Sequence, residues 1–472
     1  MSSGAAARLS LFFAVLFGIL IVRQAYVQLL AGPEIAARPY NPRHALLSAH
    51  RGRILASDGT ILAQTVGGSR QYPLADALAQ SVGYISQRYG PSGLESAYDS
   101  ALTPPDTTGN AGAQAGAIVD AVRGESSVAH GADVVTTIEP AIQNELYLRL
   151  AEHERGAGIV MDPRSGAILA IASVPSFDPN ALTQSFPALL RDSRSPLLNR
   201  ATDGLYPPGS TFKVFTASAA LDSGTVTMDS SFYDPGYYTI GNFTLHDNEW
   251  EATGSQDLTG AFALSSNVDF GQIALRMGAD VFYRYLDRWQ IGGPLDFQLP
   301  ASSAKVPAKG SILPGELAQM GFGQGALLVT PLQMLLIAST IADGGTEPRP
   351  YIVRQVVAQG GGTSSYGPGE LSAPIGAGTA SDVKAMMVAV VKRGTGMPAA
   401  LEGVTVAGKT GTASNPHGAA HSWFVCFAPA ENPRVAVAVV VENAGYGAAV
   451  AAPIARVVLQ KALAFGSGGA TE

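Results

Sequence analysis

The sequence predicts a mixed α/β or α+β protein in which an antiparallel sheet is flanked by helices, preceded by a small module and an apolar helix. The first observation is GAGIVMDPRSGAILAIAS (156–173), two apolar runs joined by a Pro-Arg-Ser-Gly turn, which is typical of a hairpin. The second is a group of three apolar runs at 404–413, 421–430 and 434–444 near the C-terminus. Because helical patterns separate these two sets of strands, the strands are expected to form one sheet covered by helices.

The composition is that of a globular protein long enough for two or three domains. The chain has 472 residues, of which 46% are hydrophobic and 14% charged. Its formal net charge of −7 gives no basic footprint, which argues against nucleic acid as a partner. Since Cys426 is the single cysteine, an intramolecular disulfide and a cysteine-based zinc cluster are both excluded.

An apolar run, Leu9 to Val22, follows Arg8 near the N-terminus and predicts a membrane segment. The run is short for a full span, but residues up to Leu30 can extend it, and no small-residue cleavage site follows directly. We therefore expect a short cytoplasmic tail (1–8) and an uncleaved, single-pass signal anchor (9–30) in the cell membrane, with a cleaved signal peptide as the alternative. The bulk of the chain is then placed on the extracytoplasmic side.

The remaining chain divides into a small N-terminal module (31–133), a large domain (134–465) and a disordered tail (466–472). In the module, ASDGTIL (56–62) predicts a hairpin turn, 75–89 an amphipathic helix and 103–117 a loop of low complexity. The large domain opens with a helix that begins at Glu139–Pro140.

The first candidate site is Tyr-Pro-Pro-Gly-Ser-Thr-Phe-Lys, in which Ser210 and Lys213 lie one helical turn apart. A serine needs an adjacent base to act as a nucleophile, and a neutral lysine can serve. The motif alone is weak, because Ser302–Lys305 and Ser381–Lys384 repeat it, the second being read as an ordinary helix N-cap.

Two further motifs distinguish Ser210 from the other serines as the candidate nucleophile. Ser265 and Asn267 form the single Ser-x-Asn of the chain, and Lys409, Thr410 and Gly411 form its single Lys-Thr-Gly. In this order, with the last motif between apolar strands, the three together point to nucleophilic acyl transfer.

This triple resembles the motifs of the penicillin-binding protein and serine β-lactamase superfamily. The chain is most similar to a class B penicillin-binding protein of the short actinobacterial type often called PbpA, and the likeness runs nearly end to end. RGRILASDGTILA (51–63) resembles the N-terminal motif of that class, in which Arg51, Gly52, Asp58 and Gly59 are structural. The segments 161–173, 199–213, 321–334 and 421–429 resemble the transpeptidase domain.

The resemblance implies a peptidoglycan D,D-transpeptidase with four catalytic residues. Ser210 would attack a stem peptide ending in D-Ala-D-Ala, Lys213 would take its proton, and Ser265 and Lys409 would relay a proton to the leaving D-alanine. The substrate would be bound by Asn267, Thr410, Gly411 and Thr412, with the backbone N–H groups of Ser210 and Thr412 as oxyanion hole. The resemblance implies neither a metal nor a cofactor.

The same resemblance sets the expected partners. These are peptidoglycan stem peptides, lipid-linked nascent glycan, β-lactam antibiotics that acylate Ser210, and a SEDS-type glycan polymerase beside the membrane helix. The alternatives are a β-lactamase, for which Glu316 is the candidate base, and a non-enzymatic β-lactam sensor or scaffold. His417 and His421 are read as loop or groove residues, and Cys426 as a small buried hydrophobe.

Overall fold

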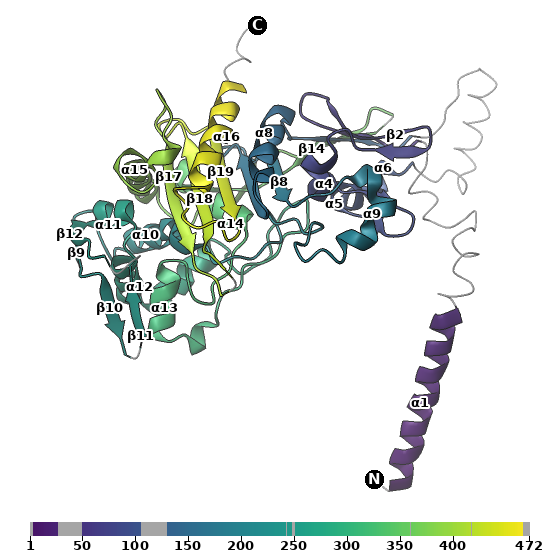
Figure 1. Cartoon of the computed structure of the whole chain (residues 1–472), viewed down its shortest axis with the longest axis horizontal. Helices are drawn as coiled ribbons and strands as arrows, with labels where there is room; N and C mark the ends of the chain where they lie inside the picture. The colour runs from purple at the N-terminus through teal and green to yellow at the C-terminus, as the bar shows by residue number, and fades with distance from the viewer. Residues whose placement is uncertain are drawn as a thin grey trace.

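The structure is a computed structural model that describes residues 3–26, 50–104, 130–241, 243–247, 251–358, 360–416 and 418–465. The predictions for 31–49, for the greater part of the 103–117 loop, for His417 and for the 466–472 tail lie outside these residues. Helix α1 (Ser3–Tyr26) lies at the N-terminal end of the chain (Figure 1). Its large apolar side chains from Leu11 to Val22 are exposed. None of the helices in the described ranges is long and apolar enough to cross a membrane.

A five-stranded sheet in the order β17-β18-β19-β7-β8 forms the centre of the molecule (Figure 1). All of its neighbouring strands are antiparallel, as expected from the sequence. Its strands are β7 (Gly156–Met161), β8 (Ile168–Val174), β17 (Ala407–Ala413), β18 (His421–Ala428) and β19 (Val435–Val441).

Helices cover both faces of this sheet. Successive side chains of a strand point to opposite sides, so each face carries apolar side chains that need to be buried. Val437 and Val439 of β19 pack with the outer helices, whereas Ala438 and Val440 belong to the inner core. The outer helices are α8 (Pro140–Ala151), for which Glu139 is the N-cap as predicted, and α16 (Ala451–Phe465). The inner layer holds α10 (Lys213–Asp222), α11 (Leu258–Leu264), α12 (Asn267–Arg288), α13 (Pro314–Gly321), α14 (Pro331–Ala342) and α15 (Ala377–Arg393).

A six-stranded sheet, β15-β14-β6-β1-β2-β3, connects the N-terminal module to the large domain. Strand β14 pairs with β6, although more than 200 residues separate them, so the predicted boundary at 133/134 falls inside a shared sheet. The strands are β1 (Ile54–Leu55), β2 (Ile61–Val66), β3 (Ser69–Gln71), β6 (Asp133–Thr136), β14 (Val353–Val357) and β15 (Thr363–Ser365).

The remaining elements are short. Around the module and the sheets lie η2 (Ala75–Leu78), α4 (Ala79–Val82), β4 (Ile85–Ser86), β5 (Gly90–Pro91), α5 (Gly93–Ala97), α6 (Asp99–Leu102), η3 (Pro179–Ala181), α9 (Leu182–Leu189), η6 (Lys309–Ser311), β13 (Glu347–Pro348), β16 (Glu370–Ser372) and η7 (Met397–Ala399). Next to α12 lie two antiparallel strand pairs. One joins β9 (Ser231–Asp234) to β12 (Gly254–Asp257), and the other joins β10 (Tyr237–Ile240) to β11 (Phe243–His246).

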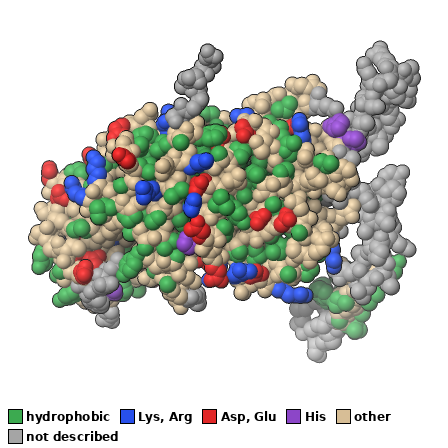
Figure 2. Space-filling model, turned by 45° about the horizontal axis from the view of Figure 1, so that its top comes forward, with side chains coloured by type: hydrophobic (Ala, Val, Ile, Leu, Met, Phe, Trp, Pro, Cys, Tyr) green, Lys and Arg blue, Asp and Glu red, His purple; other side chains and the backbone are tan. Residues whose placement is uncertain are grey.

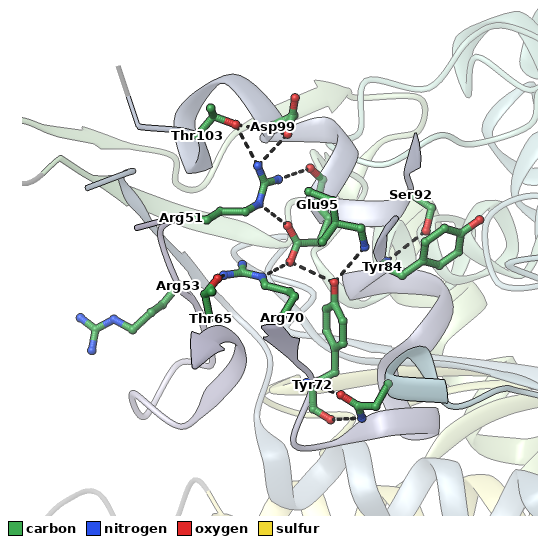
Figure 3. A network of polar contacts seen from close by, with 12 residues as sticks. Arg51, Arg53, Thr65, Arg70, Tyr72, Tyr84, Ser92, Glu95, Asp99 and Thr103 are labelled. Carbon is green, nitrogen blue, oxygen red and sulfur yellow. Dashed lines mark hydrogen bonds and ion pairs between the residues drawn. The ribbon is translucent and has the colours of Figure 1, made fainter. Parts of the chain in front are cut away.

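A buried ion-pair network holds the N-terminal module together. Figure 3 shows the guanidinium groups of Arg51 and Arg70 pointing at Glu95, with Nε–Oε distances of 2.8 and 2.6 Å. Arg51 also donates to Asp99 at 2.7 Å, and the Tyr72 hydroxyl lies 3.4 Å from Glu95. Because Glu95 is fully buried, these donors compensate its loss of hydration.

Two helix predictions were wrong. The helix expected over 75–89 ends at Val82, because Gly83 adopts a φ of +81° and the space that a Cβ would need there is taken by the carbonyl of Ser92. Ser381 is not an N-cap: α15 begins at Ala377, so Ser381 lies inside the helix, with Gly376 at the N-cap position.

Candidate active site

The predicted nucleophile lies at the start of a helix against the edge of the central sheet. Ser210 is part of the 3₁₀ turn η4 (Gly209–Phe212), and Lys213 is the first residue of α10. Ser210 is partly exposed to a cleft, whereas Lys213 is completely buried. The predicted spacing of one turn thus places a buried amine beneath an accessible hydroxyl.

Gly209 allows the turn to approach its neighbours. Its φ is +54°, and a Cβ at this position would lie 3.0 Å from the carbonyl oxygen of Thr412. On the other side, its N–H donates to the carbonyl of Gly323 at 2.8 Å. The nucleophile turn is therefore held between β17 and the Gly-Phe-Gly segment 321–323.

The Ser-x-Asn motif forms the tight turn between α11 and α12. Ser265 ends α11 in a left-handed conformation (φ 68°, ψ 35°), which for a residue with a side chain costs about 1 kcal/mol. Lys213 Nζ lies 2.5 Å from the carbonyl oxygen of Ser265, 2.8 Å from Asn267 Oδ1 and 3.4 Å from Ser265 Oγ. The strained turn thereby surrounds the amine with acceptors.

Lys409 approaches the same hydroxyl from β17. Its Nζ lies 2.8 Å from Ser265 Oγ and 3.2 Å from the carbonyl oxygen of Thr410. Ser265 Oγ therefore contacts both lysine amines, and a proton can pass through it from one to the other.

Burial controls the charge of both lysines. It lowers the pKa of Lys213 to about 7, although the charges of Asp247, Asp269 and Asp234 act in the opposite direction. Burial also lowers the pKa of Lys409 well below its usual value, and the charge of Lys213 adds to this effect. A neutral amine keeps two N–H donors and one lone pair, so Lys213 can satisfy its two close acceptors and still accept a proton.

A cleft of about 320 Å³ lies above these groups. Thr410 and Thr412 line it from alternate positions along β17, as expected for one face of a strand, and Ser414 continues the series just after the strand ends. The Thr410 hydroxyl lies 2.5 Å from that of Thr395, which also lines the cleft. Of the described residues around the cleft, none is an aspartate or a glutamate; they are Ser210, Phe243, Thr244, Leu245, His246, Leu264, Ser265, Asn267, Gln319, Phe322, Gln324, Thr395, Thr410, Thr412, Ser414, Tyr446 and Ala448.

Strand β17 is an edge of its sheet, so one row of its backbone groups is not paired with another strand. Gly411 lies where β17 meets the nucleophile turn, and a Cβ there would come within 2.9 Å of both Thr211 and Trp423. The edge of β17 and the start of η4 together form the place where an oxyanion between Ser210 and Thr412 would lie.

The structure brings the predicted catalytic and binding residues together: Ser210, Lys213, Ser265, Asn267, Lys409, Thr410, Gly411 and Thr412 all lie at or beneath the cleft. Ser302, of the second Ser-x-x-Lys, instead donates to Asp203. Glu316 caps α13 by accepting from Leu313 N–H and does not line the cleft.

The interpretation of His421 as a loop residue was wrong, because both His421 and Cys426 belong to β18. His421 is buried at its start, and its Nδ1 accepts from the N–H of Asn443. Cys426 is fully buried, and burial raises the pKa of its thiol, as expected of a packing residue. The described residues contain no group of His, Cys, Asp and Glu side chains arranged to hold a metal ion.

The groups behind the cleft lie outside the three motifs. Asp234, Asp247 and Asp269 come from β9, the segment after β11 and α12, and all three act on the charge of Lys213. Thr395 also lies outside the motifs. Nothing in the spacing of these residues marks them, because each reaches the site through tertiary packing.

Two family models match the chain. Residues 156–460 match the penicillin binding protein transpeptidase domain, and residues 51–127 match the penicillin binding protein A dimerisation domain.

Similar proteins carry the same architecture over most of their length. The chain is 32% identical over 496 residues to peptidoglycan D,D-transpeptidase PbpA of Mycolicibacterium smegmatis, covering 98% of this chain and 99% of the relative. It is 30% identical to peptidoglycan D,D-transpeptidase MrdA of Haemophilus influenzae, covering 90% of this chain and 70% of that one. The ceftriaxone acyl-enzyme complex of penicillin-binding protein A from M. tuberculosis superposes with a TM-score of 0.81 at 31% identity, covering 89% and 100% of the two chains. The chain therefore belongs to the penicillin-binding protein transpeptidase family.

Proposed function

We propose that this protein is a peptidoglycan D,D-transpeptidase that cross-links stem peptides through an acyl-enzyme on Ser210. The observation that carries the proposal is the position of Ser265 Oγ, which contacts the amines of both Lys213 and Lys409 beneath an accessible Ser210. Such an arrangement can remove a proton from one hydroxyl and return it to a leaving group.

The reaction begins when Ser210 Oγ attacks the carbonyl carbon between the two terminal D-alanines. Neutral Lys213 takes the Ser210 proton, and the carbonyl oxygen becomes an oxyanion held by the backbone N–H groups of Ser210 and Thr412. The peptide C–N bond then breaks as Ser265 and Lys409 relay this proton from Lys213 to the nitrogen of the departing D-alanine. An amine from a second stem peptide attacks the ester, restores Ser210 and completes the cross-link.

The cleft favours a long-lived acyl-enzyme over hydrolysis. A β-lactamase needs a base that activates water against the ester, and the described cleft-lining residues include no carboxylate. Glu316, the candidate base of that alternative, is engaged at the start of α13. A non-enzymatic sensor is also disfavoured, since a buried, proton-accepting Lys213 would be costly to retain without a reaction.

The proposed location is the cell membrane, single-pass, with the catalytic domain on the extracytoplasmic side. Support comes from α1, whose large side chains between Leu11 and Val22 are exposed, a property that marks lipid- or protein-contacting surfaces. On the face drawn in Figure 2, acidic and basic side chains are interspersed, which favours neither nucleic acid nor a polyanion as partner. A SEDS-type glycan polymerase and lipid-linked glycan are the partners proposed for the membrane side.

The test of the location is fractionation of the full chain and of a chain lacking residues 1–30. We expect the full chain in the membrane fraction after alkaline washing, and the shortened chain in the supernatant. Equal distribution of both chains would refute the role of α1.

The test of the activity is covalent labelling with a fluorescent penicillin, followed by intact mass and by turnover over time. We expect a stable adduct on the wild type and none on Ser210→Ala. Rapid loss of the adduct with release of hydrolysed drug would instead identify a β-lactamase. Absence of any adduct on the wild type would refute Ser210 as the nucleophile. Loss of cross-links in cells that carry only Ser210→Ala would distinguish the enzyme from a sensor.

A further inference from the structure

Behind the cleft, three aspartates from separate elements meet around the Ser-x-Asn turn. Asp234 ends β9, Asp247 follows β11, and Asp269 lies in the first turn of α12. Their side chains are largely withdrawn from solvent, with exposed fractions of 0%, 7% and 0%. Buried carboxylates need donors or protons, so the hydrogen bonds of each show where the protons must be.

Asp234 is supplied with donors on both oxygens. Its Oδ1 accepts from the N–H of Gly236 at 2.7 Å. Its Oδ2 accepts from Thr253 Oγ1 at 2.7 Å and from Ser266 Oγ at 2.8 Å. Three donors around one carboxyl group fit the ionised form, which accepts at every lone pair.

Asp247 is supplied on one oxygen only. Its Oδ1 accepts from the N–H of Asn267, while its Oδ2 lies 3.3 Å from Ser266 Oγ. Ser266 has one hydroxyl proton, which goes to Asp234 at the shorter distance. Asp247 Oδ2 and Asp234 Oδ2 therefore lie around the same Ser266 hydroxyl, and its one proton cannot satisfy two ionised carboxylates.

The two carboxyl groups hold the turn that carries the reaction. Ser265 is left-handed, and the next two residues are the ones that the aspartates bind: Ser266 through its hydroxyl and Asn267 through its N–H. Ser266 is also the N-cap of α12, accepting from Asp269 N–H at 3.0 Å. Any movement of this turn moves the oxygens of Ser265 and Asn267 that contact Lys213.

The charged groups that act on Lys213 come from several separate elements. Three are aspartates: Asp234 of β9, Asp247 after β11 and Asp269 of α12. Lys409 of β17 is the neighbouring amine, and the His246 ring lies at the end of β11. Two ionised aspartates facing a buried lysine would favour its charged form, whereas a shared proton removes one negative charge.

We propose that Asp234 and Asp247 are positioning residues of the reaction: they share one proton, carried by Asp247, and their hydrogen bonds fix the Ser266–Asn267 turn beneath Lys213. The inference rests on the proposed acyl-transfer function and goes beyond its three motifs. Burial and the interaction with Asp234 raise the pKa of Asp247 to about 7. Burial also tends to raise the pKa of Asp234, but four hydrogen bonds outweigh it, so the pKa of Asp234 is lowered. The charge assignment from donor counting and the direction of these shifts agree.

The proposal predicts that two isosteric substitutions have unequal effects. Asp247→Asn keeps an oxygen for Asn267 N–H and replaces the shared proton by an amide hydrogen, so it imitates the protonated acid. Asp234→Asn instead places an NH₂ group where Thr253 and Ser266, or Gly236, also donate. A purely structural need for two carboxylates would make both substitutions equally harmful.

The experiment measures the second-order rate constant of acylation by a fluorescent penicillin between pH 5 and 9, on the full chain, with thermal unfolding as the check of folding. At pH 7, near the pKa of Asp247, we expect Asp247→Asn within about threefold of wild type, and Asp234→Asn and Asp247→Leu lower by about 30-fold, since small displacements of catalytic groups cost this much. Asp247→Asn should also move the acid limb to lower pH, because Lys213 can no longer face an ionised Asp247.

The matched control is Asp257→Asn, which changes an exposed aspartate of the same segment at the N-cap of α11, where its side chain accepts from Gly260 N–H. Asparagine caps as well as aspartate, so we expect wild-type acylation. A second measurement does not depend on the folding of Asp234→Asn: the infrared difference between wild type and Asp247→Asn at pH 6 should contain the C=O band of a protonated carboxyl group.

Each outcome decides one point. Equal losses in Asp247→Asn and Asp234→Asn, or no protonated-carboxyl band in the difference spectrum, would overturn the placement of the proton. Wild-type acylation in Asp247→Leu would overturn the positioning role. Failure of wild-type protein to be acylated would refute the proposed function itself, which is a different result.

Discussion

The substitution Gly209→Ala tests whether the close approach between the nucleophile turn and β17 is needed for acylation. Gly209 has a φ of +54°, and its added Cβ would lie 3.0 Å from Thr412 O and 3.1 Å from Ala413 Cβ. Carbon atoms pack at about 3.5–4.0 Å, so the turn or the strand must separate by about half an ångström. Ser210 and the oxyanion site between Ser210 and Thr412 would move apart by the same amount.

The magnitude follows from two separable contributions. The left-handed backbone alone costs an alanine about 1 kcal/mol of stability. The displacement of the nucleophile adds a loss of about 10- to 100-fold in the acylation rate constant, because catalytic groups tolerate errors of only about half an ångström.

Gly224→Ala separates these contributions. Gly224 has a similar φ of +71° just beyond the other end of α10, and a Cβ there would contact nothing within 4 Å. Both variants should unfold at slightly lower temperature than wild type, but only Gly209→Ala should lose acylation by fluorescent penicillin. The reasoning is refuted if Gly209→Ala reacts within twofold of wild type, or if Gly224→Ala loses as much as Gly209→Ala.

Four further predictions concern charge and burial. Burial lowers the pKa of Lys213 to about 7, so the base is protonated below pH 7 and the acylation rate should rise between pH 6 and 8; a flat profile would contradict this. Lys213→Arg, whose side chain cannot release its proton, should lower the rate by about 10³-fold, a result checked by the same labelling. Arg51→Met should lower the free energy of unfolding of the module by about 3–5 kcal/mol, because Asp99 loses its ion-pair partner and the buried Glu95 loses one of its two arginine partners. Arg53→Met removes an exposed ion pair with Asp133 and should cost about 0–1 kcal/mol in the same unfolding measurement. Cys426 should resist iodoacetamide in the folded protein and react after unfolding, and rapid labelling of the native chain would contradict its burial.

The predictions from sequence that succeeded rest on local patterns. The strands β7, β8, β18 and β19 follow from apolar runs bounded by turns, and the helix after Lys213 follows from its apolar run. The residues of the motif triple do come together in the structure, because each motif combines a reactive side chain with a turn or a strand edge.

What could not be predicted depends on contacts between distant segments. The pairing of β14 with β6 joins residues more than 200 positions apart, and no local pattern encodes it. Gly83 ended the predicted helix because of the Ser92 carbonyl, which only the folded chain brings near. The aspartates behind the cleft were missed for the same reason, since isolated Asp residues in short strands are more often surface or turn residues.

The unfavourable features of this structure are concentrated at one place. Lys213 and Lys409 are fully buried, Ser265 holds a left-handed backbone, and Gly209 and Gly411 allow contacts that no side chain would permit. Each costs stability, and each persists because the surrounding elements over-determine it: the turn by Asp234 and Asp247, the amines by acceptors on three segments. A packed sheet covered on both faces supplies the rigidity that such a site requires. Strain and buried ionisable groups that converge on one accessible hydroxyl are explained by the reaction proposed for Ser210, because packing alone would have replaced these lysines with apolar side chains.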